Sequence, residues 1–84
     1  MNDGFLRFQV CSETPRQNLQ EVLKKHSRHV QMVSQRLKED GSGELAYRLS
    51  MRDPERVDKF LEDLHALPGL SQLTFVSHEE QAEI

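Results

Sequence analysis

Apolar and polar residues alternate in two stretches of the chain, from Phe5 to Cys11 and from Leu45 to Arg52. A period of two is typical of a β-strand with one buried face. The buried sides would hold Leu6, Phe8 and Val10 in the first stretch, and Leu45, Tyr47, Leu49 and Met51 in the second. The pattern predicts two strong strands that share one core.

A helical pattern follows the first strand. Thr14 can cap a helix whose first position is Pro15, and Gln17 stands where a capping box places Gln or Glu. The apolar stripe comprises Leu19, Val22, Leu23, His26 and Val30, and the basic residues near its end are Lys24, Lys25 and Arg28. Basic residues there complement the negative end of the helix dipole. We expect this helix to end near His29.

A second helix is predicted from Asp53, a capping residue, with Pro54 at its first position. Its apolar stripe has helical spacing and comprises Val57, Phe60, Leu61, Leu64 and Leu67. Pro68 and Gly69 end it.

Two weaker strands complete the pattern. In Gln31 to Lys38, Val33 and Leu37 would face one side and Met32 the other, as in an edge strand. A polar turn with two glycines, residues 39–43, joins it to the next strand. The last strand runs from Leu70 to Val76, and residues 78–84 form an acidic tail beyond the ordered core of residues 5–77.

The predicted order is strand, helix, strand, strand, helix, strand. Right-handed crossovers turn that order into an α+β, ferredoxin-like βαββαβ sandwich, in which both helices cover one face of a four-stranded antiparallel sheet. We expect the first and third strands to be central. The length of 84 residues suits one domain, residues 1–84, with a small stability margin.

The other face of the sheet would be open. It would carry Arg7, Gln9, Cys11, Arg48, Ser50 and Arg52, with Leu70, Thr74 and Val76 beside them. Such a face is either solvated or an interface for a dimer or a docking partner, and the pattern leaves both possibilities. The interface candidates are Arg7, Gln9, Arg48 and Ser50.

Composition excludes several classes of protein. The chain is 36% hydrophobic and 30% charged, too apolar for disorder and too charged for a membrane span. One Cys cannot form an internal disulfide, and the residues after Met1 lack the pattern of a signal peptide, so we expect a reducing compartment. With 14 acidic residues against 11 Lys and Arg, nucleic-acid binding is not expected.

Three kinds of chemistry are nearly present. Cys11 and Arg16 flank a strand-to-helix loop, as in cysteine phosphatases, but the four residues between them include no glycine to wrap a phosphate. His26 and His29, three apart on the predicted helix, are candidate metal ligands without a nearby Cys or carboxylate in sequence. An RNA-recognition domain needs aromatic residues on the open face, whereas the aromatics here are expected to point inward. We therefore expect no enzyme activity, no cofactor and no nucleic-acid partner.

The chain resembles ACT and ACT-like regulatory domains over about residues 5–77. Leu64 to Leu73 (LHALPGLSQL) is similar to their typical helix end entering the last strand, and Gly43 to Leu49 also fits. More narrowly, Phe8 to Cys11 together with that closing segment resembles the soluble C-terminal domain of MgtC/SapB-type bacterial inner-membrane proteins.

This resemblance implies a non-catalytic regulatory, dimerisation or docking domain of a membrane protein linked to magnesium stress. It would lie on the cytoplasmic face of the inner membrane, as a homodimer or docked on a membrane domain of the same protein. Amino-acid-binding ACT domains have a glycine in their first loop, where this chain has Ser12, Glu13, Thr14, Pro15 and Arg16. Ser12, Glu13, Thr14 and Arg16 are the ligand-binding candidates.

The effector-binding domain of Lrp/AsnC-type transcription regulators has the same element order, a similar third strand and a similar LPG ending. That resemblance implies the alternative function, a stand-alone domain that binds an amino acid at a subunit interface. Such regulators usually carry an Asp soon after the glycine of the turn, where this chain has Gly43-Glu44-Leu45.

Overall fold

The computed structural model describes residues 3–77, and its elements follow the predicted order. They are β1 (Asp3–Val10), α1 (Arg16–His26), β2 (Ser27–Leu37), β3 (Gly43–Met51), the short 3-10 helix η1 (Pro54–Arg56), α2 (Val57–His65) and β4 (Ser71–Ser77). The acidic tail predicted at residues 78–84 lies outside the described residues.

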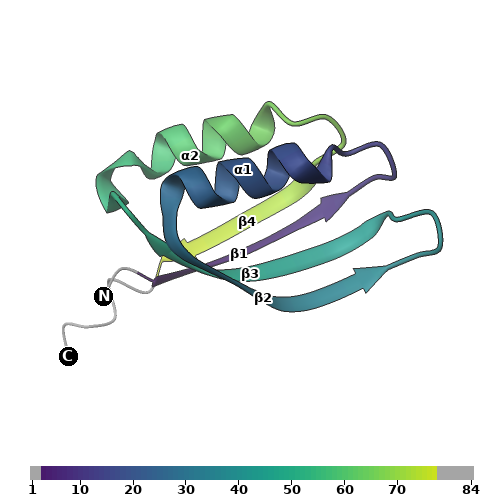
Figure 1. Ribbon diagram of the computed structural model, residues 1–84, viewed down its shortest axis with the longest axis horizontal. Coiled ribbons are helices and arrows are strands. Elements are labelled where there is room, and N and C mark those ends of the chain that lie inside the picture. The colour runs from purple at the N-terminus through teal and green to yellow at the C-terminus, as the bar shows by residue number, and fades with distance from the viewer. Residues whose placement is uncertain (1–2, 78–84) are drawn as a thin grey trace.

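One antiparallel sheet has the strand order β2-β3-β1-β4, so β1 and β3 are central as predicted. Both helices lie on the same face of this sheet, and the other face is uncovered (Figure 1). The molecule therefore has the predicted ferredoxin-like α+β fold, with two layers and one open sheet face.

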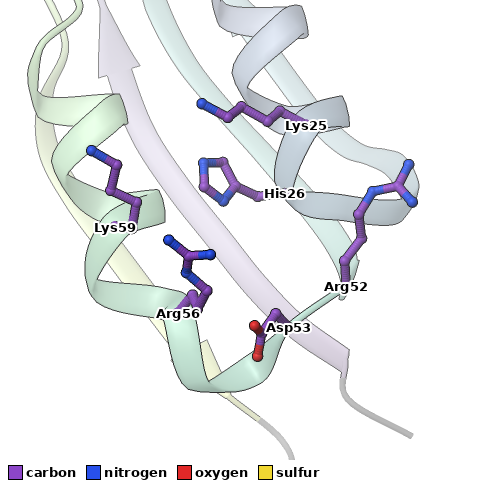
Figure 2. Close-up of a pocket in the computed structure, with 6 residues that line it drawn as sticks. All are labelled: Lys25, His26, Arg52, Asp53, Arg56 and Lys59. Atoms are coloured by element: carbon purple, nitrogen blue, oxygen red, sulfur yellow. The ribbon is translucent and has the colours of Figure 1, made fainter.

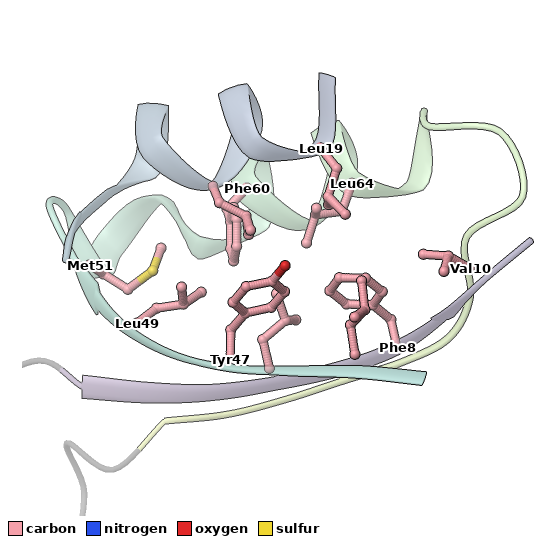
Figure 3. Packing of buried hydrophobic residues seen from close by; sticks show 11 residues of the cluster. Phe8, Val10, Leu19, Tyr47, Leu49, Met51, Phe60 and Leu64 are labelled. Carbon is pink, nitrogen blue, oxygen red and sulfur yellow. The ribbon is translucent and has the colours of Figure 1, made fainter. Parts of the chain in front are cut away.

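The buried core lies between the helices and the sheet (Figure 3). Tyr47 stacks on Phe8 with ring centroids 6.0 Å apart, and Phe75 meets the fully buried Phe60 edge-on at 5.9 Å. The remaining buried members are Leu6, Val10, Leu19, Leu23, Leu45, Leu49, Met51 and Leu64. The inward-facing residues of the two central strands and the apolar stripe of α2 thus pack in one core.

The predicted end of the first helix is wrong. The helix stops at His26, and Ser27 is already extended, with φ −130° and ψ 141°. Ser27 lies opposite Met51 and Val30 opposite Leu49, so the segment after His26 pairs with β3. Pairing with a central strand satisfies the backbone groups of this segment and turns Val30 toward the core, which a longer helix would not do.

Two local expectations also change. Thr14 does not cap α1, because its hydroxyl accepts a hydrogen bond from the Cys11 amide at 3.1 Å. In β2 the pairing register shifts between Met32 and Ser34, so Met32 lies opposite Tyr47. Val33 is then the extra residue of a bulge and is 49% exposed, rather than sharing a face with Leu37 as predicted.

Asp53 caps the second helical segment as predicted, because its side chain accepts a hydrogen bond from the Glu55 amide at 3.1 Å. The segment opens as η1 and continues as α2, which ends at His65, two residues before the predicted Leu67. The cap holds the start of this segment beside the end of β3, where the cavity described below lies.

Candidate functional site

The open sheet face is built by cross-strand rows. Phe5 lies between Arg48 on β3 and Val76 on β4, and Arg7 lies between Ala46 and Thr74. Residues paired directly across a sheet share a face. The further members of this face are Asp3, Gln9, Glu44 and Ser50 from the central strands, and His29, Gln31, Ser34 and Arg36 from β2.

The four interface candidates all lie on this face. Arg7, Gln9 and Arg48 are exposed, and Ser50 is half-buried. The Arg7 guanidinium lies 5.5 Å from the centre of the Phe5 ring, and its Nε lies 3.9 Å from Glu44 Oε2. Arg7 thus links the aromatic and acidic parts of the face.

The expectation that the aromatic residues point inward is wrong for Phe5. The sequence contained the information to place Phe5 correctly, because residues two apart in a strand point to the same face and Phe5 is two residues from Arg7. The members from β2 could not be found in this way, because the bulges break its period of two.

Three residues expected on the open face lie elsewhere. Cys11 follows β1 in the loop to α1, where its Sγ accepts a hydrogen bond from the Thr14 hydroxyl. Leu70 packs against the core cluster, and Arg52 donates a hydrogen bond from Nε to the Lys24 carbonyl at 3.4 Å, toward the end of α1. Arg52 follows the last residue of β3, where the pleat no longer dictates the direction of the side chain.

The loop between β1 and α1 does not gather its candidate residues. Ser12 and Glu13 are exposed, whereas Thr14 is buried and hydrogen-bonded within the loop. Arg16 donates from Nη2 to the Gly41 carbonyl, so its guanidinium is bound to the β2–β3 turn rather than to this loop. Ligand binding by these four residues stays a prediction.

Cys11 is held at the start of the same loop. The Thr14 hydroxyl donates to its Sγ at 3.6 Å. This hydrogen bond, with others from the Glu13 and Thr14 amides, holds the pKa of the half-buried Cys11 thiol below its usual value. The arginine that a phosphate-binding cysteine loop would need is bound to another turn.

The two candidate metal ligands are on different elements, because the helix ends three residues earlier than predicted. His26 is the last residue of α1, and its Nε2 lies 2.8 Å from Asp63 Oδ2 on α2. His29 is exposed on β2 and lies opposite Ser50 on the open face. Within residues 3–77 there is no group of three or more His, Cys, Asp or Glu placed to hold a metal ion.

A second feature, which the sequence did not indicate, is a cavity of about 270 Å³ on the helical side of the molecule (Figure 2). Three segments meet there: the last turn of α1, the link from β3 to η1, and the start of α2. Its lining residues are Lys25, His26, Arg52, Asp53, Arg56 and Lys59. Four of the six are Lys or Arg, in a chain with a net charge of −3.

Asp63 lies beside this cavity. The hydrogen bond with His26 holds the pKa of Asp63 below its usual range against the opposing effect of partial burial, and the charges of Lys25 and Lys59 act in the same direction. The nearest Nζ–carboxylate distances to Asp63 are 3.7 Å for Lys25 and 4.0 Å for Lys59.

No family model matches the chain, and no curated protein matches it. None of the helices within residues 3–77 has the length and hydropathy needed to cross a membrane.

Proposed function

We propose that this protein is a non-catalytic regulatory domain that works by docking, and that a second copy of the chain docks on its open sheet face. The observation that carries the proposal is one uncovered face that combines apolar side chains with charges of both signs. Val76, 47% exposed, and Phe5 form its apolar part, and Arg7 and Arg48 are their neighbours.

The distribution of charge limits the registers in which a second copy can dock. Along the face, Asp3 lies at one end and Glu44 toward the other, while Arg7 and Arg48 lie between them. A two-fold axis through the centre of such a face would set arginine against arginine. An axis displaced along the strands toward Glu44 instead sets Arg7 of each copy toward Glu44 of the other. Charge complementarity of this kind supports orientation and specificity more than affinity.

The edges of the sheet are less suited to pairing. In β2 the pairing register shifts twice. In β4, Gln72 has φ +51° and lies where β4 has one residue more than β1. Bulges twist an edge strand away from the flat geometry that another strand would need. Docking through the face is the remaining route on this sheet.

The size of the face predicts weak association. Strands about 4.8 Å apart and about nine residues long on average give a four-stranded sheet a flat area on the order of 550 Å². A stable interface needs about 800 Å² per partner. A dimer of this domain therefore depends on a high local concentration, which attachment to a larger assembly supplies.

This requirement agrees with the resemblance to ACT-like domains of MgtC/SapB-type membrane proteins. We extend the proposal accordingly to a domain at the cytoplasmic face of an inner-membrane protein linked to magnesium stress. Tethering in the plane of a membrane would raise the local concentration that the small face requires.

Sedimentation velocity over about 10 µM to about 1 mM protein tests the docking proposal. We expect the weight-average sedimentation coefficient to rise with concentration and Arg48→Glu to abolish that rise. Lys24→Glu, on the exposed side of α1, makes the same change of charge away from the face and serves as the matched control.

A wild-type chain that stays monomeric over this range, or an Arg48→Glu variant that associates as strongly as the wild type, contradicts the proposal. Repeating the series with Mg²⁺ and with a mixture of amino acids addresses the effector-binding alternative. That alternative predicts a change in mass that appears only when a ligand is added.

A further inference from the structure

We propose that the cavity between the end of α1 and the start of α2 binds a phosphate dianion, either free or as the monoester of a small molecule. The site is on the helical side of the molecule and is independent of docking through the open face.

The cavity gathers cations from segments far apart in the chain. Lys25 comes from the last turn of α1, Arg52 follows β3, and Arg56 and Lys59 come from η1 and α2. In Figure 2 Arg56 and Lys59 lie on the α2 side of the His26 ring and Lys25 lies on its α1 side. The Arg52 side chain extends past the end of α1 and points away from the ring. The site therefore depends on the tertiary fold rather than on a run of basic residues.

Structural roles account for only some of these charges. Lys25 lies at the negative end of the α1 dipole, and Lys59 lies one turn from Asp63, so both have partners within the fold. Arg56 forms no ion pair with any residue in the range 3–77. Arg52 contacts the Lys24 carbonyl through Nε at 3.4 Å and likewise forms no ion pair in that range. The two arginines are thus available to a ligand.

The balance of charge in the cavity favours an anion with more than one negative charge. The four cations face the carboxylates of Asp53 in the lining and Asp63 beside it, and Glu62 lies 4.0 Å from Lys59 as a third. Asp53 is committed to the Glu55 amide, and Asp63 to His26. Arg52 and Arg56 have no carboxylate partner among the described residues, and their two charges match a phosphate dianion better than a single carboxylate.

The chemistry and size of the lining agree with this class of ligand. The planar fork of an Arg guanidinium pairs with two oxygens of a phosphate, and Lys adds a point charge. The volume of about 270 Å³ is just below the usual range for small-molecule sites, which begins at about 300 Å³. It suits a phosphate group with a short substituent and is too small for a dinucleotide.

Binding is measured by titrating ¹⁵N-labelled protein with inorganic phosphate while NaCl holds the ionic strength constant. We expect saturable shifts of the Lys25, Arg52 and Arg56 amide signals, with a dissociation constant below about 10 mM. Arg56→Gln should weaken binding at least about fivefold, as the loss of one charge-assisted hydrogen bond implies. Arg48→Gln, the same change on the opposite side of the sheet, should leave it unchanged.

Two further arms identify the source of the phosphate. One uses glycerol 3-phosphate, and the other uses phosphatidylcholine vesicles with and without phosphatidic acid, whose headgroup is a phosphate monoester. Tighter binding of the soluble ester than of inorganic phosphate indicates a small-molecule ligand. Binding that requires phosphatidic acid indicates a lipid headgroup.

Shifts that do not saturate, or that NaCl alone reproduces at equal ionic strength, overturn the proposal. So does an equal loss of affinity in Arg48→Gln and Arg56→Gln. If Arg56→Gln does not fold, as judged by the dispersion of its amide signals, Lys59→Gln replaces it with the same expected loss.

Discussion

His26 Nε2 lies 2.8 Å from Asp63 Oδ2, and this contact joins the last residue of α1 to the last turn of α2. The imidazole is also packed on Phe60, with ring centroids 5.2 Å apart. Its side chain is only 11% exposed, so the hydrogen bond to Asp63 provides a polar partner that little solvent can replace. The contact fixes the two helices relative to each other at one wall of the cationic cavity.

This contact predicts a contribution to stability that depends on pH. The folded-state pKa of Asp63 lies below its ordinary value, chiefly because of the hydrogen bond with His26. The contribution is therefore present above the unfolded pKa of about 3.9 and is lost as the pH falls through the folded pKa. Urea unfolding between about pH 6 and pH 2.5 should show a smaller acid-induced loss for Asp63→Asn than for the wild type.

Asp58→Asn is the matched control for this measurement. Asp58 is an exposed carboxylate on the same helix, and it forms no ion pair within the part of the chain that the structure describes. The assignment to Asp63 is contradicted if Asp63→Asn loses as much stability in acid as the wild type. It is also contradicted if Asp58→Asn shows the smaller loss expected of Asp63→Asn.

Gly69 provides a second prediction. It has φ +81°, and a Cβ there would lie 2.2 Å from Cys11 Sγ and 2.6 Å from Thr14 Oγ1. Backbone strain and overpacking together should make Gly69→Ala cost about 2–4 kcal/mol of unfolding free energy. Removal of Sγ in a Cys11→Ala/Gly69→Ala double variant should recover part of that loss.

Gly41→Ala separates backbone strain from the steric clash. Gly41 has φ +90°, but the nearest atom to its added Cβ is 3.9 Å away. It should lose only about 1 kcal/mol, from the left-handed backbone alone. Equal losses at the two glycines would mean that the contact with Cys11 contributes nothing.

Phe60 is the central side chain of α2 in the core, fully buried against Phe75 and His26. Phe60→Ala should cost about 3–5 kcal/mol, enough to unfold a domain of this size. Phe60→Leu keeps most of the apolar volume and should remain folded with a smaller loss. Val76→Ala, at a position 47% exposed, should change stability by less than about 1 kcal/mol. Chemical denaturation measures all three.

Tyr47 combines stacking with one polar contact. Its ring is buried, and its hydroxyl accepts a hydrogen bond from Gln20 Nε2 at 3.2 Å. Tyr47→Phe should cost about 0.5–1.5 kcal/mol, because only the hydrogen bond is removed. In a double-mutant cycle with Gln20→Ala, the double variant should cost less than the sum of the single variants. Strict additivity would mean that the two groups do not interact in solution.

Local pattern was sufficient for the elements whose burial is regular along the chain. The alternation of β1 and β3 predicted two central strands, and the stripe through Phe60 and Leu64 predicted the buried side of α2. The same alternation puts Phe5 on the side of Arg7, although the aromatic residues were expected to point inward. In these segments each residue's burial follows from its own position in a regular strand or helix.

Tertiary structure alone decided the end of α1, the bulges of β2 and the cationic cavity. His26 ends its helix because the residues after it pair with β3, a strand formed by residues 43–51. Lys25, Arg52 and Arg56 come together only once that pairing brings the end of α1 to the link after β3. A periodic pattern in the sequence reflects the burial of residues within the same helix or strand. Contacts between distant segments depend on strand register and on the path of the loops, which no local period contains.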